Sequence, residues 1–376
     1  MNPAQKLTDF DQSVWLDYIR RDLLHEGGLQ RLIEQDGVKG ITSNPAIFKK
    51  AIAESDYYTG DLKILARDRS MSNESVYEAL ALEDVRQAAD LLRPVFDETQ
   101  GRDGYVSLEV SPRLARNTKG TLEAARRLWD SVDRPNLMIK IPATAEGLPA
   151  FEEVLADGIN VNITLLFSLE RYRQVAMHYL NALERRQSVG LELKPCASVA
   201  SFFLSRIDTA VDGLLEERFA LATDPDVRAR LGGLRGHAAV DSARLAYQSW
   251  KGIFSGPRWE SLKAAGARPQ RLLWASTSTK DPAYDDLLYV ESLIGPETVN
   301  TLPPATLEAL RDHGEPRLAL EDEIDLAEDR LQALKYSGID LDRVTDDLLE
   351  AGLDQFDKAY KALLDTIEEE RGRLVA

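Results

Sequence analysis

The stretch LMIKIPATAEGLPAFEEVLADGINVNITLL (residues 137–166) begins and ends with a short apolar run, LMIKI (137–141) and VNITLL (161–166). Both runs are apolar nearly throughout and do not alternate with polar residues, which is typical of parallel strands covered on both faces. Segments with apolar residues every three or four positions between such runs predict helices. The stretch therefore indicates parallel strands joined by a helix.

The same alternation continues along the chain. Helical spacing separates most of the strand-like runs, as in the segment from Val76 to Phe96. Eight strands alternating with helices favour a (β/α)8 TIM barrel over an open doubly wound sheet, which normally has fewer strands and a glycine-rich dinucleotide turn. The sequence contains neither GxGxxG nor GxxxxGK followed by Ser or Thr. The eight strands are expected at 13–17, 38–42, 105–110, 137–141, 161–166, 195–200, 271–276 and 297–301.

The chain has 376 residues, more than the roughly 250 that such a barrel needs. We expect the excess in helical insertions before the third strand, between the sixth and seventh strands, and at the C-terminus. No linker-like tract, repeat or low-complexity run interrupts the sequence, so one domain over residues 1–376 is predicted.

The segment after about Leu318 is acidic and has helical spacing. Its apolar residues form one stripe only a few turns long, which favours a helix docked across the barrel over a coiled-coil stalk. The same stripe leaves a homo-oligomer open, because it could cover the barrel or a partner subunit. The stripe consists of Leu349, Leu353, Phe356, Tyr360, Leu363 and Ile367.

Composition excludes several classes of protein. The chain carries 46 Lys and Arg against 63 Asp and Glu, a net charge of −17, which argues against nucleic-acid and anionic-membrane partners. One cysteine cannot form an intrachain disulfide, the N-terminus lacks an apolar signal core, and no window is apolar enough for a membrane helix. We therefore expect a cytoplasmic, soluble protein.

Lys140 is the most informative residue, because it lies inside the otherwise apolar run LMIKI. An ammonium group is costly to bury without a partner, and burial lowers a lysine pKa and makes the neutral amine a nucleophile toward carbonyls. The alternative is a lysine that reaches out from a strand end or pairs structurally with a carboxylate.

Polar residues in neighbouring strands strengthen the catalytic interpretation. Asp17 ends its strand, Glu109 lies in the third, and Asn162 and Thr164 stand two apart in the fifth, on one face. A barrel gathers such positions around one axis at the carboxyl ends of its strands. Taken singly, each has a structural alternative: a helix cap for Asp17, a buried ion pair for Glu109, and strand hydrogen bonds for the other two.

Metal and thiol chemistry have little support in the sequence. The four histidines are scattered, and no HExxH or Cys/His metal spacing occurs. Cys196 has no histidine near it in sequence and is expected to be a small packed residue. We therefore expect no metal site and no cofactor.

Six segments spread over most of the chain have the form of motifs that occur together, in this order, in one enzyme family. They are TSNPAIF (42–48), SLEVSPRLA (107–115), MIKIPAT (138–144), VNITLLFS (161–168), ASFFLSRID (200–208) and WASTSTKDP (274–282). Through them the chain resembles the transaldolases, class I aldolase-like Schiff-base enzymes, and the last segment is similar to the form in the longer bacterial branch.

The resemblance implies a role for each matching residue. Lys140 would form the Schiff base with the donor ketose, and Asp17 would take and return the proton of the hydroxyl at the bond being cleaved. Glu109 and Thr164 would position a water for carbinolamine dehydration. This division agrees with the chemistry, because cleaving a carbon–carbon bond beside a carbonyl needs an electron sink, which a protonated imine supplies.

The resemblance also implies the substrate contacts. Asn44 and Asn162 would hold the hydroxyls of the dihydroxyacetone group, and Ser201, Phe203 and Arg206 match the family's Ser-x-Phe-x-x-Arg segment.

The phosphate would be held by Arg206 with Ser276 and Lys280. Many relatives place an arginine two residues after the serine that follows the seventh strand, where this chain has Ser278. Which of Ser276, Ser278 and Lys280 contacts the phosphate therefore stays open.

The implied function is transfer of a dihydroxyacetone unit from sedoheptulose 7-phosphate or fructose 6-phosphate to glyceraldehyde 3-phosphate or erythrose 4-phosphate, in the pentose phosphate pathway. One alternative is a Schiff-base aldolase that releases free dihydroxyacetone, although such enzymes are much shorter. Another is an idle sugar-phosphate-binding barrel, which would have no need for a buried amine.

Overall fold

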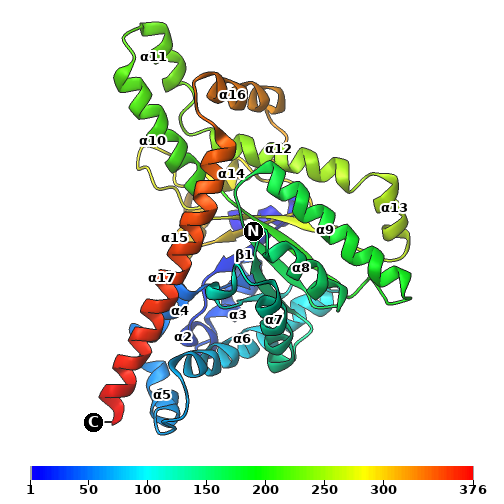
Figure 1. Cartoon of the computed structure of the whole chain (residues 1–376), viewed down its shortest axis with the longest axis vertical. Helices are drawn as coiled ribbons and strands as arrows, with labels where there is room; N and C mark the ends of the chain where they lie inside the picture. Colours follow the sequence, from blue (N-terminus) through cyan, green and yellow to red (C-terminus); the bar gives the residue numbers. More distant parts are fainter. Residues whose placement is uncertain (1, 376) are drawn as a thin grey trace.

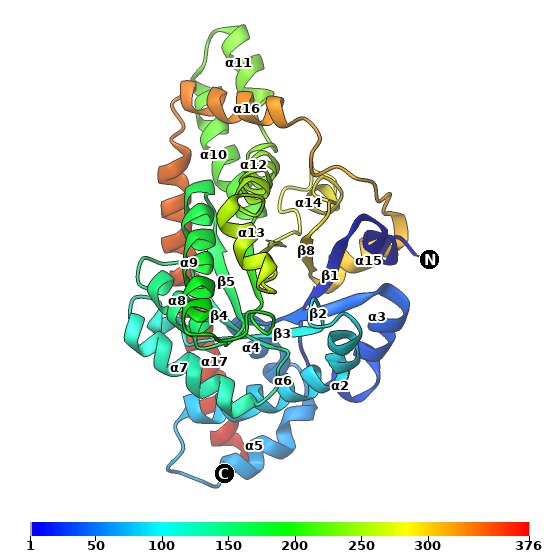
Figure 2. The ribbon, with the colours of Figure 1, turned by 90° about the vertical axis from the view of Figure 1, so that its right-hand side faces the viewer.

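The computed structural model describes residues 2–375, and in it eight parallel strands close into a barrel in chain order (Figure 1, Figure 2). Each strand pairs with the next, and the last pairs with the first, so no strand edge is left open. The predicted (β/α)8 barrel is confirmed. The strands are β1 (Gln12–Asp17), β2 (Val38–Thr42), β3 (Tyr105–Glu109), β4 (Leu137–Pro142), β5 (Val161–Leu166), β6 (Ser198–Phe203), β7 (Arg271–Ala275) and β8 (Thr298–Leu302).

Seven of these strands lie within one residue of their predicted bounds, whereas the sixth prediction was wrong. The strand expected at 195–200 is β6, which begins three residues later at Ser198. Pro195 has no N–H to give to a central ladder, and the Cys196 N–H bonds back to the carbonyl of Leu193 in a turn. The shift brings Ser201 and Phe203 into the strand itself.

The helical insertions occur where the sequence predicted them. Three helices precede β3 after β2, four lie between β6 and β7, and two follow the helix after β8. The α-helices are α1 (Pro3–Lys6), α2 (Arg21–His25), α3 (Gly28–Asp36), α4 (Pro45–Ala53), α5 (Thr59–Leu65), α6 (Asn73–Glu98), α7 (Thr118–Val132), α8 (Gly147–Ala156), α9 (Leu169–Ser188), α10 (Ser205–Leu221), α11 (Pro225–Gly232), α12 (Ala238–Ile253), α13 (Pro257–Ala264), α14 (Leu288–Glu291), α15 (Pro304–His313), α16 (Ile324–Tyr336) and α17 (Leu341–Val375). Short 3-10 helices are η1 (Leu7–Phe10), η2 (Asp56–Tyr58) and η3 (Pro112–Leu114).

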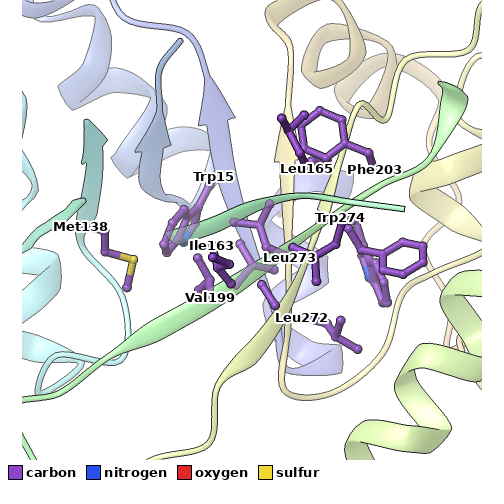
Figure 3. Close-up of a cluster of buried hydrophobic side chains, with 14 of the residues drawn as sticks. Trp15, Met138, Ile163, Leu165, Val199, Phe203, Leu272, Leu273 and Trp274 are labelled. Atoms are coloured by element: carbon purple, nitrogen blue, oxygen red, sulfur yellow. The ribbon is translucent and has the colours of Figure 1, made fainter. Parts of the chain in front are cut away.

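Trp15 fills the barrel near its amino end and is among the buried side chains of Figure 3. Gly40 on the neighbouring strand makes room for it, because a Cβ there would lie 2.5 Å from the indole. The indole N–H donates to Asp103 over 3.0 Å, and Arg271 pairs with the same carboxylate at 2.9 Å. The buried polar groups at the amino end of the barrel are therefore hydrogen-bonded to one another. In barrels of this type the active site lies at the opposite, carboxyl end of the strands.

The C-terminal helix α17 runs along the barrel and packs on α4, α10, α6 and α5 (Figure 1). Leu363 and Ile367 of its predicted stripe are fully buried, and the Tyr360 hydroxyl donates to Glu74 over 2.6 Å. The docked helix is confirmed and the stalk interpretation is wrong. Within residues 2–375, none of the helices is both long and apolar enough to span a bilayer.

Candidate active site

Four predicted residues lie on the inner face of the barrel, on β1, β3, β4 and β5. The register sets Glu109 of β3 opposite Lys140 of β4, and Lys140 opposite Asn162 of β5. Residues in register on parallel strands point to the same face, so these three side chains share the barrel interior. Asp17, the last residue of β1, stands in register with Thr42 at the end of β2.

Lys140 is 5% exposed and is the one buried lysine in residues 2–375. Its Nζ donates to the backbone carbonyl of Ser43 over 3.3 Å. It forms no ion pair within 4.0 Å with any residue of that range, which disfavours the structural ion-pair alternative. An amine held this way has no carboxylate locked onto it, so its lone pair becomes available once the proton leaves.

Asp17 is held by a hydroxyl and not by a helix. The Thr42 hydroxyl donates to Asp17 Oδ1 over 2.7 Å and lies 2.7 Å from the Thr301 hydroxyl. Burial raises the pKa of Asp17, while the charge of Lys140 and the hydrogen bond from Thr42 act to lower it. The next helix begins only at Arg21, so the helix-cap alternative does not apply.

Glu109 is the second carboxyl group beside Lys140. Burial raises its pKa to about 7, the charge of Lys140 acts to lower it, and Asp17 acts to raise it. Near neutral pH this carboxyl is therefore divided between its acid and base forms, which suits a group that both gives and takes protons.

Three oxygens near the ends of β3 and β5 are buried without a hydrogen-bond partner in the described part of the chain: Glu109 Oε2, Ser111 Oγ and Thr164 Oγ1. A cavity of about 20 Å3 lined by Glu109, Ser111, Tyr77 and Tyr360 adjoins the first. That volume is enough for one water molecule. Thr164 lies within a bulge in β5, a feature often found beside active sites.

The predicted amide and hydroxyl ligands form a short chain across the barrel. Ser201 donates to Asn162 Oδ1 over 2.6 Å, and Asn162 Nδ2 donates to Ser107 over 3.1 Å. Asn44 caps α4, because its Oδ1 accepts from the Ile47 N–H at 3.1 Å. Asn162 is thus oriented by two strands, whereas Asn44 is held at the loop after β2.

Sequence reasoning missed Thr42, Ser43, Ser107 and Thr301, which orient Asp17, Lys140 and Asn162. The available signal was weak: each is a polar residue within or directly after an expected strand. Their partners lie in strands far away in sequence, as for the 259 residues between Thr42 and Thr301.

Arg206 is the second residue of α10, close to the carboxyl end of β6. Its guanidinium lies 5.4 Å from the ring centre of Phe203 and 6.0 Å from that of Phe356. Ser276 is nearby, because its hydroxyl lies 2.9 Å from that of Ser205, the residue before Arg206. These two predicted phosphate ligands therefore belong to one region.

Lys280 is exposed and donates to Ser278 over 2.7 Å. It lines a different cavity, of about 280 Å3, with the carboxylates Asp208 and Asp212. Its contact with phosphate stays a prediction.

The loop that carries Lys280 is fixed to α10 by two tyrosines. Tyr289 donates to Asp208 and Tyr284 donates to Asp212, each over 2.8 Å. These anchors decide where the loop after β7 lies.

Cys196 is fully buried, and burial raises the pKa of its thiol. That environment suits a packed residue and not a thiolate. Across residues 2–375, no group of three or more His, Cys, Asp or Glu side chains is placed to hold a metal ion.

Comparison with known proteins adds to this geometry. A family model described as Transaldolase/Fructose-6-phosphate aldolase matches residues 14–367. A Thiobacillus denitrificans protein named Transaldolase is 50% identical over 97% of this chain and 99% of its own length. Proteins of the same name from Thermobifida fusca and Trichodesmium erythraeum are 50% and 45% identical, over 98% and 99% of this chain and 98% of each relative.

Proposed function

The chain belongs to the transaldolase/fructose-6-phosphate aldolase family and is an enzyme of the transaldolase type, and on this premise we propose that Lys140 is its imine-forming residue. The observation that carries the proposal is the buried amine of Lys140, located beside two carboxyl groups, Asp17 and Glu109, whose pKa values are raised. Imine chemistry requires a nucleophile with acid/base groups close to it.

The reaction proceeds through a covalent intermediate. The Lys140 amine adds to the ketose carbonyl, and loss of one water from the carbinolamine gives the protonated imine. Glu109, at a pKa of about 7, supplies the proton that leaves with this water, and Thr164 orients the water with its unpaired hydroxyl.

Carbon–carbon cleavage then uses the other carboxyl group. Asp17 takes the proton of the hydroxyl on the far side of the bond, the aldose leaves, and the electron pair moves into the imine as an enamine. Attack of the enamine on a second aldose reverses these steps, and Asp17 returns the proton. The hydrogen bond from Thr42 keeps the Asp17 carboxylate oriented throughout.

The substrates we propose are a ketose phosphate, sedoheptulose 7-phosphate or fructose 6-phosphate, and an aldose phosphate, glyceraldehyde 3-phosphate or erythrose 4-phosphate. Asn162 and Asn44 hold the dihydroxyacetone hydroxyls. Arg206 and Ser276, with Lys280, hold the phosphate. A chain with net charge −17 does not attract anions at long range, so local donors must supply the binding energy. We place this activity in the cytoplasm.

The family description also covers aldolases that act on fructose 6-phosphate, and acceptor dependence separates the two activities. The purified enzyme is incubated with fructose 6-phosphate, with and without erythrose 4-phosphate. We expect sedoheptulose 7-phosphate only with the acceptor and little free dihydroxyacetone without it. Equal donor cleavage in both reactions would overturn the transferase assignment.

A matched pair of variants tests whether catalysis depends on Lys140. Lys140→Ala should abolish the transfer. Lys119→Ala, at an exposed site on α7, should keep it. Loss in both variants, or in neither, would contradict the role of Lys140 in catalysis.

A further inference from the structure

Helix α17 follows the barrel in sequence but approaches the region assigned to phosphate. It packs on α10, which carries Arg206, and on β5, which carries Thr164. Figure 1 shows α17 running past α10 and α4 along the barrel. Two residues of α17 one helical turn apart, Gly352 and Phe356, lie beside Arg206.

The Arg206 guanidinium is enclosed by aromatic rings and not by acids. Phe203 from β6 and Phe356 from α17 lie within 6.0 Å of its central carbon. It makes no hydrogen bond and no ion pair with the residues that the structure describes. The side chain is half-buried, so its five N–H donors are free to bind water or an anion that enters the site.

Gly352 is a buried glycine in the middle of a 35-residue helix. A glycine there destabilises a helix by about 1 kcal/mol relative to alanine, so the presence of glycine at this position requires a structural explanation. A Cβ at this site would lie 3.2 Å from Leu165 Cδ2 and 3.4 Å from Arg206 Nη1. The glycine thus allows the helix to approach Arg206 closely.

Leu165 is the rigid side of this contact. It is 1% exposed, belongs to the buried cluster of Figure 3, and has a left-handed backbone with φ of 61° in the β5 bulge. A left-handed leucine is strained and persists only where its surroundings hold it. Because Leu165 cannot easily give way, an added methyl group at Gly352 would push α17 outward, away from Leu165 and from Arg206.

We propose that α17 forms one wall of the substrate site, and that Gly352 and Phe356 are positioning residues that hold the Arg206 guanidinium against Phe203 for the substrate phosphate. This inference rests on the proposed function, because it assumes that Arg206 binds phosphate. It makes the segment after the barrel a determinant of preference for phosphorylated substrates.

The first test compares two glycines of the same helix. Among the described residues, nothing lies within 4 Å of the Gly372 Cβ position, so Gly372→Ala matches Gly352→Ala in helix propensity but adds no contact with them. Imine formation is measured by borohydride trapping and mass spectrometry, with fructose 6-phosphate and with dihydroxyacetone as donors. We expect Gly352→Ala to raise the half-saturating concentration of fructose 6-phosphate about 3- to 10-fold, the range between an exposed and a desolvated cation–π contact, and to change that of dihydroxyacetone less than twofold.

The second test is a double-mutant cycle between Phe356→Leu and Arg206→Ala. If Phe356 acts through Arg206, Phe356→Leu should weaken the binding of fructose 6-phosphate to the wild-type enzyme. It should have no further effect on that binding when Arg206→Ala is already present. Equal losses in both backgrounds, equal losses on both donors, or equal effects of the two glycine variants would overturn the proposal. Failure to trap any imine in the unmodified enzyme would instead overturn the proposed function.

Discussion

Replacing Glu109 by glutamine should make stability less dependent on pH. Burial raises the pKa of Glu109 from 4.5 to about 7 in the folded protein. The folded chain therefore holds this proton more tightly than the unfolded chain, and the stability it contributes is fully present below pH 4.5 and is lost as pH rises through 7. Glutamine, which is always neutral, avoids this loss.

The two pKa values set the size of the effect. The rise in the pKa of Glu109 from 4.5 to about 7 corresponds to about 3 kcal/mol of stability, at about 1.4 kcal/mol for each pKa unit. Screening by solvent reduces the expected contribution to about 1–3 kcal/mol. Relative to the wild type, Glu109→Gln should gain this free energy of unfolding between pH 4.5 and pH 8. The pKa of Asp208 is also raised to about 7. Because Asp208 is present in both proteins, its contribution cancels in the stability difference between them.

The assay is urea unfolding of both proteins at half-unit steps of pH, with Glu123→Gln on the exposed face of α7 as the control. The difference in free energy of unfolding between Glu123→Gln and the wild type should not change with pH. In parallel, the wild-type pH–rate profile should contain a limb near pH 7 that Glu109→Gln lacks. A constant stability difference from pH 4.5 to pH 8 would refute the reasoning, because it would mean that Glu109 titrates alike in both states.

Three further outcomes are expected. Asp17→Ala should still form the imine but turn over about 10²–10⁴-fold more slowly, as for a lost general base, and near-normal steady-state turnover would contradict its role. Arg206→Ala should lower kcat/KM for phosphorylated donors about 10–100-fold and leave kcat/KM for dihydroxyacetone unchanged, and Lys280→Ala should cause a smaller loss of the same kind. Equal losses on both donors would show that these residues support the fold. Gly40→Ala should destabilise the barrel by about 1–3 kcal/mol in thermal unfolding, because its Cβ would overlap Trp15, and an unchanged midpoint would show that the indole can move.

The barrel was predictable because parallel strands buried on both faces leave continuous apolar runs, as in LMIKI and VNITLL. A lysine in such a run is a conspicuous exception, so Lys140 could be singled out as a candidate without a structure. The sixth strand was misplaced because Pro195 and Cys196 continue an apolar run but belong to a turn. A run of apolar residues does not show where the hydrogen bonds between neighbouring strands begin.

The contacts that orient the site were not predictable, because they join distant segments. Thr301 reaches Thr42 across the barrel closure, and the loop of Lys280 is held by hydrogen bonds from Tyr284 and Tyr289 to α10. The stripe on α17 predicted that the helix docks but not what it touches. The approach of Gly352 to Arg206 depends on the packing of the whole barrel.

Borohydride trapping tests the central claim most directly. The protein is incubated with fructose 6-phosphate, reduced, digested and sequenced by mass spectrometry, with Lys140→Arg as the comparison. Arginine keeps the charge but offers no nucleophilic amine. We predict one reduced three-carbon adduct, located on Lys140, and none in the variant. An adduct on another lysine, or an unchanged adduct in Lys140→Arg, would contradict the account.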